Sequence, residues 1–255
     1  MHIYFHLFSR TIPAYGLFMA LGLCLAAIFA LIRCKNSGIH PNDVLIILCI
    51  CFLGALVGGK LLYLLATYGA GQIRRDIAEG DFSFLFSGGL VFYGGLVGGL
   101  LLLPLGLRVS GEHRLNLLAN AVVPCIPLGH AIGRVGCLFA GCCYGLPYSG
   151  FGAVNLSEAG ILYPVFPIQL VEAGINLLLS AGLLLLGRRK LQGFRLLYVY
   201  LMVYALERFT LEFFRGDILR GMTAGLSTSQ WISIFLFILS ATLALLRFPG
   251  KAYAR

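Results

Sequence analysis

Charge is scarce in this chain. Asp, Glu, Lys and Arg together make up 11% of its 255 residues, and only ten residues are acidic. Soluble domains carry about 25% charged residues, whereas here 59% of the residues are hydrophobic and the mean hydropathy is +0.91. The composition therefore excludes an ordinary soluble domain and predicts a chain embedded in a membrane.

Acidic residues are rarer than basic ones, so the formal net charge is +9. In a soluble protein this excess would suggest a nucleic-acid partner. Here Lys and Arg fall in short gaps between apolar runs, which favours anchoring to anionic lipid headgroups. We expect the bilayer, and no nucleic acid, as the partner of these residues.

The chain also has no linker, low-complexity tract or clear internal repeat, and its first residues lack the pattern of a cleavable signal peptide. Pro13 and Tyr15-Gly16 open a long apolar run, so we expect the first helix to be retained. These features predict one integral-membrane domain over residues 1–255.

Long apolar runs dominate the sequence. A spanning helix needs about 20 mainly apolar residues, and seven segments approach this length. They predict an all-α polytopic bundle of about seven transmembrane helices. The sixth must face protein or water, because it contains Glu207, Arg208 and Glu212. The seven segments are Pro13–Ile32, Val44–Ala66, Leu90–Leu107, Leu115–Leu138, Ile168–Leu186, Leu196–Phe214 and Gln230–Leu246.

The distribution of basic residues predicts the orientation, because cytoplasmic loops are enriched in Lys and Arg. One set of gaps carries Arg33, Lys35, Arg108, Arg114, Arg188, Arg189, Lys190, Arg195, Arg247, Lys251 and Arg255. The opposite set carries fewer, namely Arg10, Arg74, Arg75, Arg208, Arg215 and Arg220. We therefore expect the N-terminus outside and the C-terminus in the cytoplasm, with Arg134 near the outer face.

The segment His130–Gly145 holds the strongest functional signal, because Arg134 lies at the end of an apolar run. A guanidinium at mid-bilayer costs about 2.5–3.5 kcal/mol on insertion scales. A lipid phosphate would offset this cost, since the planar fork of Arg binds two oxygens. Gly133 and Gly136 would let the backbone approach such a ligand closely.

Only three of the eight cysteines cluster in the sequence, namely Cys137, Cys142 and Cys143. The positive charge of Arg134 would favour a thiolate there. Three interpretations stay open: Cys142 as a nucleophile or acyl carrier, a disulfide with Cys137, and a metal site with His130. Cys-x4-Cys-Cys is not a usual zinc spacing, so we expect no metal and no cofactor.

A glycine-rich block covers Ser87–Gly99. Gly94 and Gly95 permit close approach of a ligand, and Tyr93 offers a hydroxyl donor. The alternative is a helix entry with a packing face, as the small-xxx-small pairs Gly54/Gly58, Gly95/Gly99 and Gly129/Gly133 also suggest.

Tyr204, Arg208, Glu212 and Arg215 fall on one helical face. Arg208 and Glu212 can form a purely structural ion pair, which would leave Arg215 for a substrate anion. Glu207 points about 100° away from that face.

Three further polar side chains begin apolar runs. Tyr15 is either an interface anchor or a hydroxyl that faces the substrate. Gln169 and Glu172 follow Pro167 and are expected to face the bundle, either in the site or as helix-start capping and packing residues.

Taken together, these motifs resemble the prolipoprotein diacylglyceryl transferase family of bacterial membrane enzymes. The match runs in order through nearly the whole chain. It comprises Ile12–Gly16, Phe92–Gly98, Gly133–Gly136 with Gly141 and Gly145, Pro167–Glu172, Tyr204–Arg215, and Gly225–Ser227 with Gln230 and Ser233.

The resemblance implies a seven-helix enzyme of the bacterial inner membrane whose site opens to the outer leaflet. Such enzymes move the diacylglyceryl group of phosphatidylglycerol to the cysteine thiol of a prolipoprotein signal peptide and release glycerol phosphate. By resemblance, Arg134 and Arg208 would hold the phosphate, and Tyr15, Tyr204 and Glu212 would line or brace the site.

The chain departs from the family pattern at two places. Tyr93 stands where the family usually has a histidine, and Gly136–Cys142 replaces a segment that has two asparagines and a glutamate in the family. Tyrosine, with a reference pKa near 10, is a poor base at neutral pH. Two alternatives therefore stay open: a lipid-binding or transport protein on this scaffold, or a transferase with another acceptor. A membrane thiol-redox protein is a third.

Overall fold

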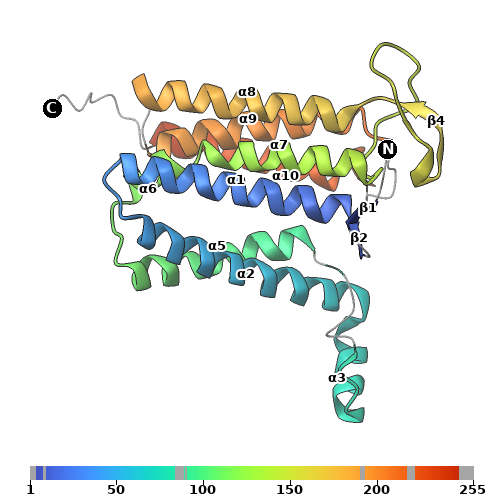
Figure 1. Ribbon diagram of the computed structural model, residues 1–255, viewed down its shortest axis with the longest axis horizontal. Helices are drawn as coiled ribbons and strands as arrows, with labels where there is room; N and C mark the ends of the chain where they lie inside the picture. Colours follow the sequence, from blue (N-terminus) through green and yellow to red (C-terminus); the bar gives the residue numbers. More distant parts are fainter. Residues whose placement is uncertain are drawn as a thin grey trace. The chain divides into compact units, whose positions relative to one another are not determined.

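The computed structural model describes residues 4–7, 10–83, 89, 91–189, 193–216 and 222–246 (Figure 1). Ser87, Gly88 and Leu90 of the glycine-rich block lie outside these residues, as do Lys190, Arg220, Arg247, Lys251 and Arg255 of the charge pattern. The described helices are α1 Ala14–Asn36, α2 Pro41–Thr67, α3 Gly69–Glu79, α5 Phe92–Ser110, α6 Leu115–Val122, α7 Cys125–Phe139, α8 Ile168–Arg189, α9 Phe194–Glu212 and α10 Thr228–Leu246.

The strands form three short antiparallel pairs rather than a continuous sheet. β1 Tyr4–Leu7 pairs with β2 Arg10–Pro13, β3 Val154–Leu156 with β4 Ile161–Val165, and β5 Met222–Thr223 with β6 Leu226–Ser227.

The prediction of a helical polytopic membrane protein is confirmed, because five helical segments are long and apolar enough to cross a bilayer. They are Ala14–Asn36, Pro41–Leu65, Leu115–Phe139, Ile168–Arg188 and Thr228–Leu246, and Gly94–Ser110 is a shorter apolar helix. The total of seven spans and the orientation of the termini stay predictions. The amphipathic helix α3, which carries Arg74 and Arg75, was not predicted.

The fourth apolar run forms one candidate span, Leu115–Phe139, in agreement with the prediction, but its helix is interrupted between α6 and α7. Pro124 lies at the break, and proline cannot donate a backbone hydrogen bond. Neighbouring helices satisfy the carbonyl groups at the break: Ser180 Oγ donates to the Pro124 oxygen at 2.7 Å, and Arg33 donates to the Asn120 and Ala121 oxygens at 2.9 Å. Unpaired carbonyl groups would be costly at this depth.

Two compact units divide the chain. Cys34–Arg114 form one unit, whose main contact is between α2 and α5. Glycines bring these two helices together: Gly58 faces Gly94, and Gly54 faces Gly98. A Cβ atom added at Gly54 would lie 2.5 Å from the Gly98 oxygen. The small-residue pattern therefore encodes close helix packing here.

The other unit contains Met1–Arg33 and Leu115–Arg255. In this unit α7 packs on α8, α8 on α9, and α9 on α10 (Figure 1). Between α1 and α7, a Cβ atom at Gly22 would lie 2.7 Å from the Gly129 oxygen, and one at Gly136 would lie 2.7 Å from Phe18 Cβ. The small residues of α7 therefore allow α1 to approach α7 closely along the helix.

Substitution of Gly58 by leucine is expected to destabilise the α2–α5 pair by about 1–3 kcal/mol, because the added side chain meets the Gly94 backbone. The matched control is Gly182→Leu in α8, since no neighbouring atom lies within 4 Å of a Cβ built there. Thermal unfolding in detergent micelles measures both variants. Equal midpoints would contradict glycine-mediated packing.

Candidate active site

A buried ion pair joins α7 to α8. Arg134 Nη2 lies 2.6 Å from Glu172 Oε1, and the two side chains are 12% and 2% exposed. Arg134 Nε also donates a hydrogen bond to His130 Nε2 at 3.2 Å, one helical turn earlier. The guanidinium is thus fixed on two edges by groups from two helices.

A second polar contact joins α8 to α9. Asn176 Nδ2 donates to Glu207 Oε1 at 2.8 Å and to the Glu172 backbone oxygen at 2.9 Å. Both Asn176 and Glu207 are buried. Glu207 thus faces α8 rather than the Arg208–Glu212 pair, in agreement with its position on the helix.

The ion pair on α9 forms between Arg208 Nη2 and Glu212 Oε2 at 2.7 Å. The same nitrogen donates to Ser229 Oγ on α10 at 3.2 Å. Arg215 Nε lies 3.9 Å from Glu212 Oε2, so Glu212 lies between two guanidiniums. Buried Arg208 Nη1 has no hydrogen-bond partner among the described residues.

Arg134 and Arg208 have buried neighbours in common. Arg134 and Arg208 both lie within electrostatic range of His130, Tyr204 and Glu207. The rings of His130 and Tyr204 are 5.6 Å apart, which connects α7 directly to α9. Both guanidiniums therefore lie within range of the same three buried groups, and their convergence on one substrate anion stays a prediction.

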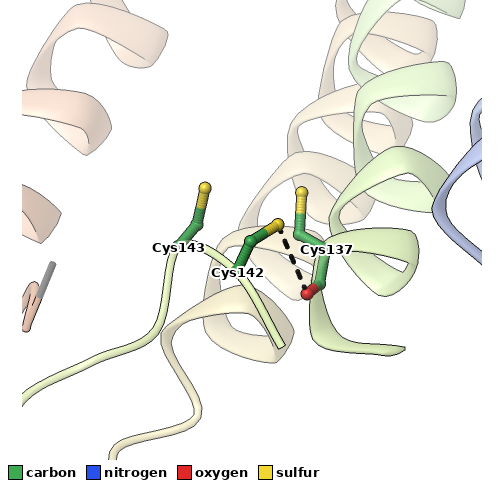
Figure 2. Close-up of side chains that lie close together, drawn as sticks. All are labelled: Cys137, Cys142 and Cys143. Atoms are coloured by element: carbon green, nitrogen blue, oxygen red, sulfur yellow. Dashed lines mark hydrogen bonds between the residues drawn. The ribbon is translucent and has the colours of Figure 1, made fainter. Parts of the chain in front are cut away.

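Two of the three clustered cysteines, Cys137 and Cys143, lie within electrostatic range of Arg134. The sulfur atoms of all three lie within 4.8 Å of one another (Figure 2). Gln169 Nε2 donates to the Cys142 backbone oxygen at 2.9 Å, which attaches the cysteine turn to the start of α8. Tyr15 on α1 lies within electrostatic range of all three thiols and of Arg134.

The two thiols after α7, Cys142 and Cys143, have pKa values shifted in opposite directions. Hydrogen bonds from Cys137 and Cys142, together with the nearby guanidiniums of Arg215 and Arg134, lower the pKa of the Cys143 thiol. The hydrogen bonds of Cys142 to Cys137 and Cys143 raise the pKa of the Cys142 thiol. These pKa directions favour negative charge at Cys143, and the role of Cys142 as a nucleophile stays a prediction.

Several predicted site residues lie together in this unit, namely Tyr15, Arg134, Cys142, Gln169, Tyr204, Arg208, Glu212 and Arg215. Tyr93, Gly94 and Gly95 belong to the other unit, where Tyr93 lies in the first turn of α5 and Gly94 packs against Gly58. Gly133 and Gly136 face Met19 and Phe18 of α1. Substrate contact by any of these residues stays a prediction.

The arginines have protein partners that the sequence did not indicate. The charge of Arg134 is partly offset by Glu172, and Arg215 Nε lies 3.9 Å from Glu212 Oε2. Binding of a substrate anion by either arginine stays a prediction. His130 binds Arg134 rather than joining the cysteines, and all eight cysteines, each within the described ranges, are free thiols rather than disulfides.

Sequence reasoning missed the roles of Asn176, Glu207 and Ser229. A signal was present for two of the contacts, because His130/Arg134 and Glu172/Asn176 are both polar pairs four residues apart in apolar helices. Polar side chains at membrane depth need partners inside the bundle. From this rule one can predict which polar residues need partners, but not which helix supplies each partner.

The fold and this cluster define a multi-pass membrane protein with a buried site of arginines, carboxylates and thiols. The family profile described as Prolipoprotein diacylglyceryl transferase matches residues 2–246. The chain belongs to this family.

Relatives that share this description cover nearly the whole chain. A Clostridium perfringens (strain 13 / Type A) protein named phosphatidylglycerol–prolipoprotein diacylglyceryl transferase 2 is 32% identical over 91% of this chain and 90% of its own length. A Clostridium tetani transferase is 32% identical over 93% of this chain and 94% of its own length. A Bordetella avium transferase is 30% identical over 88% of this chain and 86% of its own length.

The Arg134–Glu172 pair is expected to show strong coupling in a double-mutant cycle. Arg134→Gln and Glu172→Gln should each lower the free energy of unfolding by about 3–5 kcal/mol, because each leaves a buried charge without its partner. The double variant should lose less than the sum of the two. Unfolding in mixed micelles measures all four proteins, and additive losses would contradict the pairing.

Proposed function

We propose that this protein transfers the diacylglyceryl group of phosphatidylglycerol to the cysteine thiol of a prolipoprotein signal peptide. Family membership and the names of the relatives support this activity. The single structural observation that carries it is Arg208 Nη1, a buried guanidinium nitrogen with no partner among the described residues. A phosphate oxygen is the ligand that such a donor prefers.

The reaction needs a positive site for the leaving phosphate. The acceptor thiol loses its proton to solvent, its sulfur forms a bond to the glyceryl carbon while the bond from that carbon to the phosphate oxygen breaks, and glycerol phosphate leaves. Charge develops on this oxygen. Arg134 and Arg208, already held in position by Glu172 and Glu212, stabilise it electrostatically with little reorganisation.

The carboxylates limit how tightly a phosphate binds. Glu172 and Glu212 neutralise much of the positive charge, yet each guanidinium has five N–H donors and its carboxylate uses only part of them. Arg215 lies near the same carboxylate of Glu212 and adds positive charge to the cluster. A phosphate then accepts hydrogen bonds from the remaining N–H donors of Arg134 and Arg208, while Glu172 and Glu212 stay in place.

The other predicted site residues act around this anion. In this proposal Tyr15 and Tyr204 lie next to the bound phosphate, Glu212 orients Arg208, and Gln169 holds the cysteine turn through the Cys142 carbonyl. Cys142 faces the acceptor, since it is the exposed member of the three thiols. Gly133 and Gly136 lie against Met19 and Phe18 of α1. Tyr93, Gly94 and Gly95 belong to the other unit, and contact between these residues and the substrate stays a prediction.

The proposed topology places this reaction at the outer leaflet of the bacterial inner membrane. The chain would cross the membrane seven times as a single domain, with α9 and the shorter α5 completing the five long apolar spans. The N-terminus lies outside and the C-terminus in the cytoplasm, in agreement with the distribution of basic residues. Phosphatidylglycerol and the signal peptide then reach the site from the same side.

Arg134→Lys and Arg208→Lys should each lower the transfer rate at least about 100-fold, because lysine keeps the charge but loses the planar fork. Purified protein is incubated with labelled phosphatidylglycerol and a lipobox peptide, and glycerol phosphate release and peptide labelling are followed together. Arg188→Gln, an exposed position at the end of α8, is the control and should keep full activity.

Other outcomes of this experiment would overturn the proposed activity. Release without peptide labelling would indicate a different acceptor. Lipid bound to the wild-type protein without any release would indicate a lipid-binding or transport protein on the same scaffold.

A further inference from the structure

The three thiols of Cys137, Cys142 and Cys143 converge from a short stretch of chain (Figure 2). Cys137 lies in the last turn of α7, which ends at Phe139. The backbone then reverses through Gly141, with φ of 65°, and Cys143, with φ of 57°. Cysteine rarely adopts this left-handed region, so the fold holds Cys143 in a costly conformation that turns its thiol toward the other two.

Hydrogen bonds from several elements hold this turn. The Cys142 backbone nitrogen donates to the Cys137 oxygen at 3.1 Å, and Cys142 Sγ points toward the same oxygen at 3.7 Å. Gln169 holds the Cys142 carbonyl from α8. Gly216 donates its backbone N–H to the Tyr144 oxygen at 2.9 Å, which ties the end of the turn to the segment after α9. The thiols are therefore arranged before any ligand arrives.

Two guanidiniums lie near the thiols. Arg215 and Arg134 both lie within electrostatic range of Cys143. Thiolates are the ligand form of cysteine, and nearby cations stabilise them. Three sulfur atoms bound at the usual zinc–sulfur length of about 2.3 Å would lie about 3.8 Å apart in a tetrahedral site. The observed limit of 4.8 Å between them requires only small side-chain movements.

We propose that Cys137, Cys142 and Cys143 bind one thiophilic cation, Zn²⁺ being the best match, and that its fourth position takes the thiol of the acceptor peptide. Three protein ligands with one open position are the arrangement of catalytic rather than structural zinc sites. Cys142 is exposed and Cys143 partly exposed, so the open position is accessible from outside the protein.

The role of the fourth position rests on the proposed transferase activity. A thiol that coordinates a metal ion loses its proton, and that proton leaves to solvent. The metal-bound sulfur then attacks the glyceryl carbon, the carbon–oxygen bond to phosphate breaks, and no electron is gained or lost overall. Tyr93, which replaces the family's histidine, is then not required to remove the proton.

Metal binding is tested on the full-length protein, purified in detergent under reducing conditions and titrated with Cd²⁺ as a spectroscopic probe. The expected result is one Cd²⁺ per chain with thiolate-to-cadmium charge-transfer absorbance. Cys142→Ser and Cys143→Ser should each weaken Cd²⁺ binding at least about 100-fold. Loss of a residue that only supports a metal ligand costs up to about 100-fold in affinity, and these variants lose a ligand itself. Cys49→Ser, which lies in α2, is the control and should bind as the wild type does.

Two results would overturn the metal site: no stoichiometric Cd²⁺ binding by the reduced wild-type protein, or equal binding by all three variants. Because this measurement needs no lipid and no turnover, it stands apart from the transferase activity. Elemental analysis of protein isolated from zinc-supplemented cells provides the matching measurement for Zn²⁺.

The fourth position is tested by adding a lipobox peptide to the cadmium-loaded protein. The charge-transfer absorbance should rise by about one third, from three cadmium–sulfur bonds to four. A peptide with serine in place of its cysteine should cause no change. An unchanged absorbance with the cysteine peptide would remove the acceptor-thiol role while the metal site remains. Diacylglyceryl transfer by metal-free protein would also overturn that role.

Discussion

Charged side chains buried among apolar helices impose the main constraint on this structure. An unpaired charge inside a bundle is far more costly than a paired one, and Arg134 meets that requirement with Glu172, while Arg208 meets it with Glu212. The Arg134–Glu172 pair also connects α7 to α8. Since the hydrophobic effect does little to hold helices together inside lipid, such contacts and close glycine packing determine which helices are neighbours.

The chemistry of the site follows from this pairing. The carboxylates hold the guanidiniums in place, so these can act on a developing negative charge without first reorganising. Cys137 and Cys143 lie within electrostatic range of Arg134, Cys143 also lies within range of Arg215, and all three thiols lie within range of Tyr15. One region of the unit thus combines buried guanidiniums with clustered thiols, and the proposed reaction between a phospholipid and a thiol requires both kinds of group.

Much of the fold could be predicted from the sequence because hydropathy alone selects the apolar helices. The break between α6 and α7 could not, since the consequence of Pro124 depends on carbonyl partners from α1 and α8. For the site, helical spacing places Tyr204, Arg208 and Glu212 on one face. The partner of Arg134 could not be predicted, because Glu172 lies on another helix and only tertiary packing brings the two together.

The break in the fourth apolar run has a mechanical consequence. Arg33 from α1 and Ser180 from α8 donate hydrogen bonds to carbonyl groups on either side of the break. These hydrogen bonds restrict bending of the helix at this point. The first residue of α7 is thereby held between α1 and α8, and the helix carries this constraint to Arg134, nine residues further along the chain. A break that would loosen an isolated helix therefore helps to position this guanidinium among its neighbouring helices.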